Sequence, residues 1–261
     1  MSNFKTLIYE KKDDIAYVTL NRPKALNVYN IQMRDDLYEV LGAIKDDSEV
    51  SVAIFKGAGE KAFCAGADLS EFLTAPSPIV ARRVRFERDV WGLFLSIPQP
   101  LIAALHGFVL GSGIEIALCC DIRIASENAQ VGQTELNVGL IPGWGGTQRL
   151  PRYVGKAMAK EMIFTGKRID AKTAERYGLI NIVVPVDQFM AKVKELATQI
   201  AEKSPIAVRF CKSLINSSTE TSQEAGMWQE AEAFGILTST EDFNEGVTAF
   251  LEKRKPQYKG K

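Results

Sequence analysis

The sequence predicts an α/β fold that ends in a helical region. Apolar segments of four to seven residues, typical of buried strands, alternate with amphipathic helical patterns through most of the chain. From Asp187 onward the pattern is entirely helical. We therefore expect a layered α/β unit over residues 1–190, followed by a C-terminal helical unit over 191–261.

The elements of the first unit follow in order. Two β-rich segments, TLIYEKK and IAYVTLN, predict a hairpin that turns at Asp13 and Asp14. Asn30 is placed to cap a helix whose apolar face is formed by Met33, Leu37, Val40, Leu41 and Ile44. The remaining elements expected here are a strand in VSVAIFKG, an amphipathic helix over 78–96, a strand in PLIAALHG, a short helix in GIEIALCCD, a strand in IRIAS and a last strand in GLINIVVP.

Four helical segments make up the C-terminal unit. They are VDQFMAKVKELATQIAEK, SPIAVRFCKSLINSS, EAGMWQEAEAFGIL and STEDFNEGVTAFLEKRKP, and in the last one Ser239 and Asp242 have the spacing of a capping box. Met227, Trp228 and Phe234 lie in short helices that have little other apolar surface to cover them. We expect them to pack on another part of the chain or on another subunit.

Composition excludes several classes of function. Lys plus Arg equals Asp plus Glu at 32 each, so no global charge attracts nucleic acid or an anionic membrane. The four cysteines form no CxxC pair and His106 is the one histidine, which leaves little for a metal site. The N-terminus has no export signal, and the uncharged stretch 90–114 is interrupted by proline and glycine. We expect a cytoplasmic protein with reduced cysteines.

Two acidic residues stand out because of their surroundings. Glu115 lies in the apolar run LGSGIEIALCCDI, and Glu135 lies between an apolar segment and a glycine-rich loop. An acid in the first turn of a helix is favoured by the helix dipole, but this does not explain its burial. Paired carboxylates in an apolar cleft divide acid and base roles, because burial raises a glutamate pKa toward neutral pH.

Ser112 suggests two other chemistries that the sequence does not support. A dinucleotide-binding fingerprint beginning at Gly111 would need a glycine where Ile116 stands. A nucleophile elbow would need glycines at Leu110 and Ile114. The small residues of AFCAGADLSEF and GFVLGSGIE instead suggest backbone N–H groups exposed to an anionic oxygen, although such loops are often plain turns.

Together these segments resemble the crotonase, or enoyl-CoA hydratase/isomerase, family. The resemblance covers nearly the whole chain and rests on LNRPKALN, FCAGADL, HGFVLGSGIEIALCCDIRIAS, VGQTELNVGLIPGWGGTQRLPRYVG, AERYGLINIVVP and AFLEKRKP. It implies a spiral of ββα units with a C-terminal helical region, assembled as a homotrimer or a dimer of trimers. It also implies acyl-CoA substrates and no metal or redox cofactor.

The resemblance assigns residues to the reaction centre. The amides of Ala67 and Ser112 match the oxyanion hole that stabilises a thioester enolate. Glu135 matches the acid that protonates the α-carbon, and Glu115 matches the group that activates water at the β-carbon. Gly143 matches the position whose amide contacts that water.

The resemblance also assigns substrate-binding positions. Those for CoA are Lys24, Ala25, Leu26, Ala65, Asp68 and Leu69, with Phe250 and Lys253 at the adenine end, sometimes from a neighbouring subunit. An ordinary surface charge is the alternative for Lys24 and Lys253. Three residues depart from the family pattern, namely Ser112 for glycine, Thr134 for proline and Trp144 for a small residue. Trp144 is expected in the acyl pocket, and His106 is expected to be structural.

The predicted function is addition of water to a 2-enoyl-CoA thioester to give a 3-hydroxyacyl-CoA. A hydratase of cyclic or dienoyl substrates and an isomerase are alternatives within the fold. A non-catalytic binder is the alternative outside it, disfavoured by the two intact glutamates and, for RNA, by the neutral charge.

Overall fold

The computed structural model describes residues 4–72, 77, 79–80, 83 and 87–261. Its main sheet has the strand order β1-β2-β3-β5-β7-β10, in which β1 and β2 form the predicted antiparallel hairpin and the other neighbours are parallel. The strands are β1 (Leu7–Lys12), β2 (Ile15–Leu20), β3 (Val52–Gly57), β5 (Leu101–Leu105), β7 (Ile122–Ser126) and β10 (Ile182–Val184).

A second sheet of four short strands carries several of the predicted site residues at its strand ends. Its order is β4-β6-β8-β9, with β4, β6 and β8 parallel and β9 antiparallel to β8. The strands are β4 (Ala62–Cys64), β6 (Phe108–Leu110), β8 (Gln130–Gly132) and β9 (Arg168–Asp170). These short strands did not appear among the elements expected from the sequence, because three residues are too few to show an alternation.

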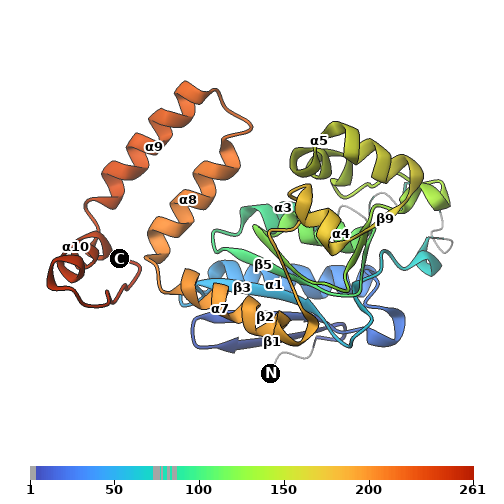
Figure 1. The fold of residues 1–261 in the computed structure, drawn as a ribbon, viewed down its shortest axis with the longest axis horizontal. Coiled ribbons are helices and arrows are strands. Elements are labelled where there is room, and N and C mark those ends of the chain that lie inside the picture. Colours follow the sequence, from blue (N-terminus) through green and yellow to red (C-terminus); the bar gives the residue numbers. More distant parts are fainter. Residues whose placement is uncertain (1–3, 73–76, 78, 81–82, 84–86) are drawn as a thin grey trace.

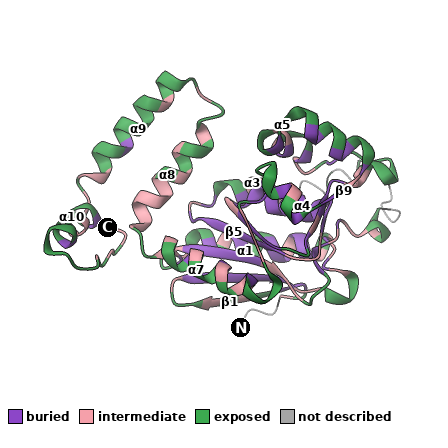
Figure 2. Ribbon diagram, in the orientation of Figure 1, coloured by how far each residue is buried: buried purple, intermediate pink, exposed green. Residues whose placement is uncertain are grey.

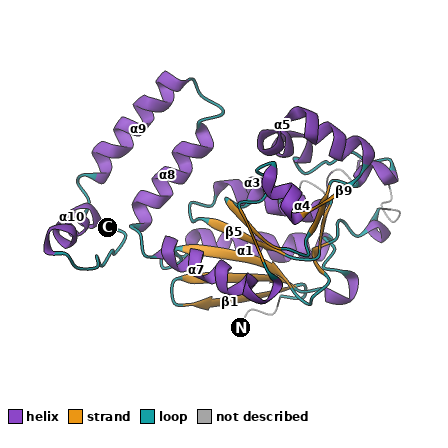
Figure 3. Cartoon of the chain, in the orientation of Figure 1, coloured by secondary structure: helices purple, strands orange, loops and turns teal. Residues whose placement is uncertain are grey.

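Helices cover both faces of the main sheet (Figures 1 and 3). The α-helices are α1 (Ile31–Asp46), α3 (Val90–Ser96), α4 (Ser112–Cys119), α5 (Gly146–Thr165), α6 (Ala171–Arg176), α7 (Phe189–Ala201), α8 (Pro205–Ser217), α9 (Gln223–Leu237) and α10 (Glu241–Glu252). Single 3-10 turns are η1 (Pro23–Ala25), η2 (Leu69–Glu71), η3 (Glu135–Val138) and η4 (Val186–Gln188).

Strand β3 shows how the core is divided between the two faces. Ala53 and Phe55 point into the larger core formed with α1, α3, α4 and α5, whereas Val52 and Ile54 point into the smaller core beneath α7. Successive side chains of a strand alternate between faces. A strand buried on both sides is therefore apolar throughout, which is why VSVAIFKG was recognisable as a strand.

Two local expectations need correction. The helix expected over 78–96 is interrupted before α3, which begins at Val90 after Asp89 accepts a hydrogen bond from Gly92 N; residues 78, 81–82 and 84–86 lie outside the described part. The capping box at Ser239 is wrong by one residue. Thr240 caps α10 by accepting from Phe243 N, because Asp242 is buried and instead accepts from Ser204 and the chain's end. The Asn30 cap of α1 is confirmed.

The last three helices extend away from the sheets as an arm (Figure 1). Figure 2 shows that α9 and most of α10 are exposed and that α8 is largely half-buried, in contrast to the buried strands. Trp228 is 73% exposed and Phe250 is 82% exposed. Among the described residues, no helix is long and apolar enough to cross a membrane.

Candidate active site

Several of the predicted site residues directly follow strands that end at the same edge of the second sheet. Residues 65–69 follow β4, residues 111–115 follow β6, and Glu135 opens η3 just after β8. Since these three strands are parallel neighbours, their carboxyl ends lie together. In α/β proteins this is the usual edge for ligand binding. The structure thus brings together segments that are far apart in the sequence.

Glu115 is held by main-chain amides. It lies in the first turn of α4 and is 1% exposed. Its Oε1 accepts hydrogen bonds from Trp144 N at 2.8 Å and from Gly146 N at 2.9 Å. Its Oε2 is buried and has no hydrogen-bond partner among the described residues. One oxygen therefore fixes the carboxyl group, and the other keeps its hydrogen-bonding capacity unused in the described structure.

Glu135 repeats this arrangement with a side-chain donor. Its Oε1 accepts from Gln133 Nε2 at 3.0 Å, and within the described ranges its buried Oε2 has no partner. Gln133 itself is completely buried. Gln133 was not predicted, because a lone glutamine beside an acid carries no distinctive sequence signal.

Burial shifts both carboxyl groups toward neutral pH. Burial raises the pKa of Glu115, the charge of Glu135 adds to the rise, and the amides of Gly146 and Trp144 oppose it, so that the net pKa is about 7. Desolvation also raises the pKa of Glu135 above its ordinary value, while hydrogen bonds, including that from Gln133, oppose the shift. Glu115 is thus suited to gain and lose a proton near pH 7, and Glu135 keeps its proton to a higher pH than an ordinary glutamate does.

Gly111 makes room for this arrangement. Its φ of 52° lies in the region that favours glycine, and a Cβ at this position would lie 3.2 Å from Glu135 Oε1 and 3.5 Å from Gly66 Cα. The end of β6, the segment after β4 and the Glu135 carboxylate therefore meet at one point.

The two predicted oxyanion amides lie at this meeting point. Tyr29 forms a parallel bridge to Ala67 through Gly66 O and Asp68 N, so the N–H of Ala67 itself points away from Tyr29. Ser112 is the first residue of α4, where helical N–H groups have no partner within the helix. Gly113 follows, and a Cβ there would collide with Cys64 O, which shows how closely α4 lies on β4.

The predicted CoA residues fall into two groups. Lys24, Ala25 and Leu26 in and after η1 lie beside the 65–69 segment, because Ala65 N donates to Leu26 O at 3.0 Å. Phe250 and Lys253 are not brought to this region by their own chain, since α10 lies at the opposite end of the molecule from α5 and β9 (Figure 1). Leu69 is about half exposed.

Asp68 is occupied by its own neighbours. Its carboxylate accepts from Ser70 Oγ at 2.7 Å and pairs with Arg22 Nη2 at 2.9 Å. The Ser70 hydroxyl and the Arg22 guanidinium hold the pKa of Asp68 below its ordinary value. Arg22 also donates to Val28 O at 2.7 Å, so it ties the η1 loop to the 65–69 segment. Arg22 was not predicted, because its partner is distant in sequence.

Trp144 belongs to a cluster of three aromatic rings. Its ring stacks on Trp91 with a centroid distance of 5.2 Å and meets Tyr29 edge-on at 6.2 Å. Tyr29 and Trp91 are each 7% exposed. Gly143 precedes Trp144 in the same loop. His106 lies apart from the glutamates, and its Nε2 is 2.9 Å from Gly59 O.

The chain is similar to a large set of known proteins over nearly its full length. A sequence profile described as enoyl-CoA hydratase/isomerase matches residues 10–261. A short-chain-enoyl-CoA hydratase of Clostridium acetobutylicum is 46% identical over 95% of both chains. A crotonyl-CoA hydratase of Syntrophomonas wolfei is 42% identical over 98% of both. The crystal structure of an enoyl-CoA hydratase from Bacillus anthracis superposes with a TM-score of 0.94 at 41% identity, covering 98% of this chain and 100% of the other.

Proposed function

Because the chain belongs to the enoyl-CoA hydratase/isomerase family, we propose that it adds water to a 2-enoyl-CoA thioester and forms a 3-hydroxyacyl-CoA. The family and the fold class expected from the sequence are confirmed. One observation carries the reaction type. Glu115, which is buried, and Glu135, which is half-buried, each have one oxygen anchored and the other without a partner in the described structure, at the edge where the Ala67 and Ser112 amides also lie.

The proposed reaction uses these groups together. Water lies between the two glutamates, and Glu115 takes its proton as the oxygen attacks the β-carbon. The electron pair of the double bond moves to the thioester oxygen, where the N–H groups of Ala67 and Ser112 stabilise the enolate. Glu135 then delivers a proton to the α-carbon. No step requires a metal or a redox cofactor.

CoA is proposed to bind between the loop at residues 24–26 and the segment at residues 65–69, next to the two glutamates. Lys24, Ala25 and Leu26 contact the nucleotide and pantetheine from one side, and Ala65, Asp68 and Leu69 from the other. Gly143 contributes its amide to the water, and Trp144 lines the acyl pocket. Support comes from the main-chain hydrogen bond that places Ala65 against Leu26.

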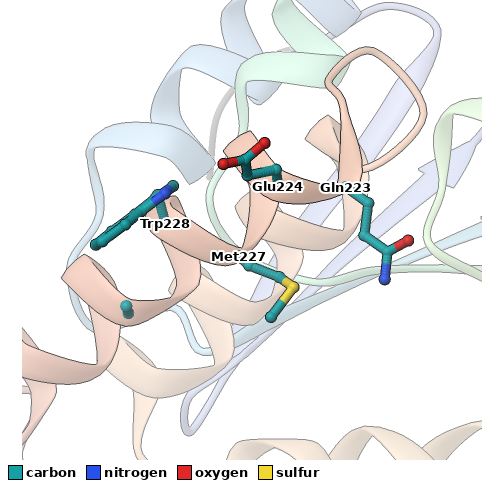
Figure 4. Close-up of a pocket in the computed structure, with 5 residues that line it drawn as sticks. Gln223, Glu224, Met227 and Trp228 are labelled. Carbon is teal, nitrogen blue, oxygen red and sulfur yellow. The ribbon is translucent and has the colours of Figure 1, made fainter.

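The adenine end is proposed to be completed by a second copy of the chain. Phe250 and Lys253 lie on an arm that leaves its own site (Figure 1). Met227 and Trp228 line a surface hollow on α9, together with Gln223, Glu224 and Ala231 (Figure 4). Exposed apolar patches of this kind are typical of subunit interfaces. A core unit over 1–190 and an oligomerisation unit over 191–261 are therefore proposed, with a trimer or a dimer of trimers as the assembly.

The location proposed for the enzyme is the cytoplasm. The assembly is checked by light scattering, which should give three or six times 28.8 kDa. A monomer at micromolar concentration would contradict the subunit proposal.

Loss of the enoyl-thioester absorbance of crotonyl-CoA tests the activity. We expect hydration, with a product heavier than the substrate by one water. An isomerase would leave the mass unchanged, and a specialised hydratase would act on cyclic or dienoyl thioesters but poorly on crotonyl-CoA. No turnover of any enoyl-CoA would refute the proposal and favour a non-catalytic binder.

A further inference from the structure

Arg149, in the first turn of α5, reaches back to the loop that holds Glu115. Its Nη1 donates to Trp144 O at 2.6 Å. The guanidinium lies close to Gly145, whose φ is 96° and where a Cβ would collide with Nη1 and lie 2.8 Å from Cζ. Glycine at position 145 therefore serves both the left-handed turn and the close approach of the arginine.

The carbonyl that Arg149 binds lies between the two amides that bind the glutamate. Trp144 N and Gly146 N both donate to Glu115 Oε1. These two donors belong to the peptide groups on either side of the Trp144–Gly145 peptide, and the hydrogen bond from Arg149 restrains the peptide group that joins them. Arg149 thus contacts the Glu115 carboxylate indirectly, through the main chain of residues 144–146.

We infer that Arg149 is a positioning residue for Glu115, an inference that rests on the hydratase function proposed above. It fixes the amide pair through the Trp144 carbonyl and places a positive charge near the carboxylate. Within the described ranges, no carboxylate oxygen lies within 4 Å of the Arg149 guanidinium as an ion pair. Its charge therefore acts on the site without being neutralised by a direct partner.

Two charged groups bear on Glu115 with opposite signs. The Glu135 carboxylate raises the pKa of Glu115, whereas Arg149 lowers it. Without the guanidinium, burial and the charge of Glu135 still raise the pKa of Glu115, but Arg149 no longer lowers it. Glu115 would therefore lose its proton only at a higher pH. A proton acceptor held in this way would then work at higher pH.

The test compares Arg149→Gln and Arg149→Lys with the unmodified enzyme. We expect Arg149→Gln to lower kcat by about 10- to 100-fold, the effect of one lost charge-assisted hydrogen bond, with less than about a threefold change in KM because CoA contacts are untouched. The acid limb of kcat/KM against pH should move to higher pH. Arg149→Lys keeps a positive charge and one hydrogen-bond donor. It should therefore recover part of kcat, and the acid limb of its pH profile should lie close to that of the unmodified enzyme.

Arg152→Gln is the matched control. Arg152 lies in the same helix, is exposed, and donates to Gln148 O at 2.8 Å, so its loss should leave kcat and the pH profile unchanged. An unmoved acid limb in Arg149→Gln, or equal losses in the glutamine and lysine variants, would overturn the inference while the hydratase function stands. Absence of hydration in the unmodified enzyme would refute the proposed function itself.

Discussion

Replacement of Glu115 by glutamine is expected to stabilise the folded protein at alkaline pH while it removes activity. Burial and the charge of Glu135 raise the pKa of Glu115 from 4.5 to about 7. A shift of this size makes ionisation in the folded protein less favourable than in the unfolded chain by about 3 kcal/mol. The penalty is absent below pH 4.5, grows as the pH rises, and is complete above about 7.

The Glu115→Gln variant removes this penalty and keeps the main anchor. The glutamine carbonyl can accept from Trp144 N and Gly146 N as Oε1 does. Its NH2 group would occupy the place of Oε2, which has no partner in the described structure. That unsatisfied donor destabilises the variant by about 1–3 kcal/mol, but by the same amount at every pH.

The change in relative unfolding free energy between two pH values therefore reports the ionisation of the Glu115 carboxyl group alone. Urea unfolding of both proteins at equal concentration should show that the variant gains about 2 kcal/mol relative to the unmodified enzyme between pH 5 and pH 8. Glu60→Gln, in an exposed position, should show no such pH dependence. A relative stability that stays constant between the two pH values would refute the assignment of a raised pKa to Glu115.

Other predictions concern activity. Glu135→Gln should lower turnover of crotonyl-CoA by about 100-fold or more without weakening CoA binding in calorimetry; unchanged turnover would contradict its role as the acid. The acid limb of kcat/KM should lie near pH 7, where Glu115 ionises, and a limb near pH 4 would contradict its role as the base. Gly111→Ala should lower kcat by about tenfold or more, because the added Cβ would lie 3.2 Å from Glu135 Oε1. Gly42→Ala is the control, since its added Cβ would contact no neighbouring atom within 4 Å. It should keep kcat and raise the free energy of unfolding by about 0.5–1 kcal/mol in thermal unfolding. Trp144→Ala keeps its amide and should raise the preference for longer enoyl-CoA substrates by about tenfold; an unchanged preference would place the acyl chain elsewhere.

The sequence predicted those parts of the fold that repeat over several residues. The β1–β2 hairpin, the Asn30 cap and the buried strand β3 each combine an apolar pattern with a turn or capping signal. Strands β4, β6 and β8 lack enough residues for such a pattern. Their pairing is nonetheless what brings the site together, so the site's location depended on tertiary contacts that a single sequence does not display.

The glutamates were identifiable because an acid in an apolar run is unusual. Their anchors were not, since Trp144 N and Gly146 N are main-chain donors that any residue would supply. Arg149 and Gln133 act over short distances in space but show no periodic or motif signal of their own. The sequence thus pointed to the chemistry, and the folded structure supplied the groups that orient it.

Because Glu115 is anchored by main-chain amides, the side chain at position 144 can change without altering the hydrogen bond that holds Glu115. Since every residue except proline supplies an amide N–H at position 144, the ring of Trp144 can be exchanged without removing the donor to Glu115. With Trp144 in the acyl pocket as proposed, the size of the acyl group accepted is therefore free to diverge between lineages while the proposed proton-transfer groups stay constant.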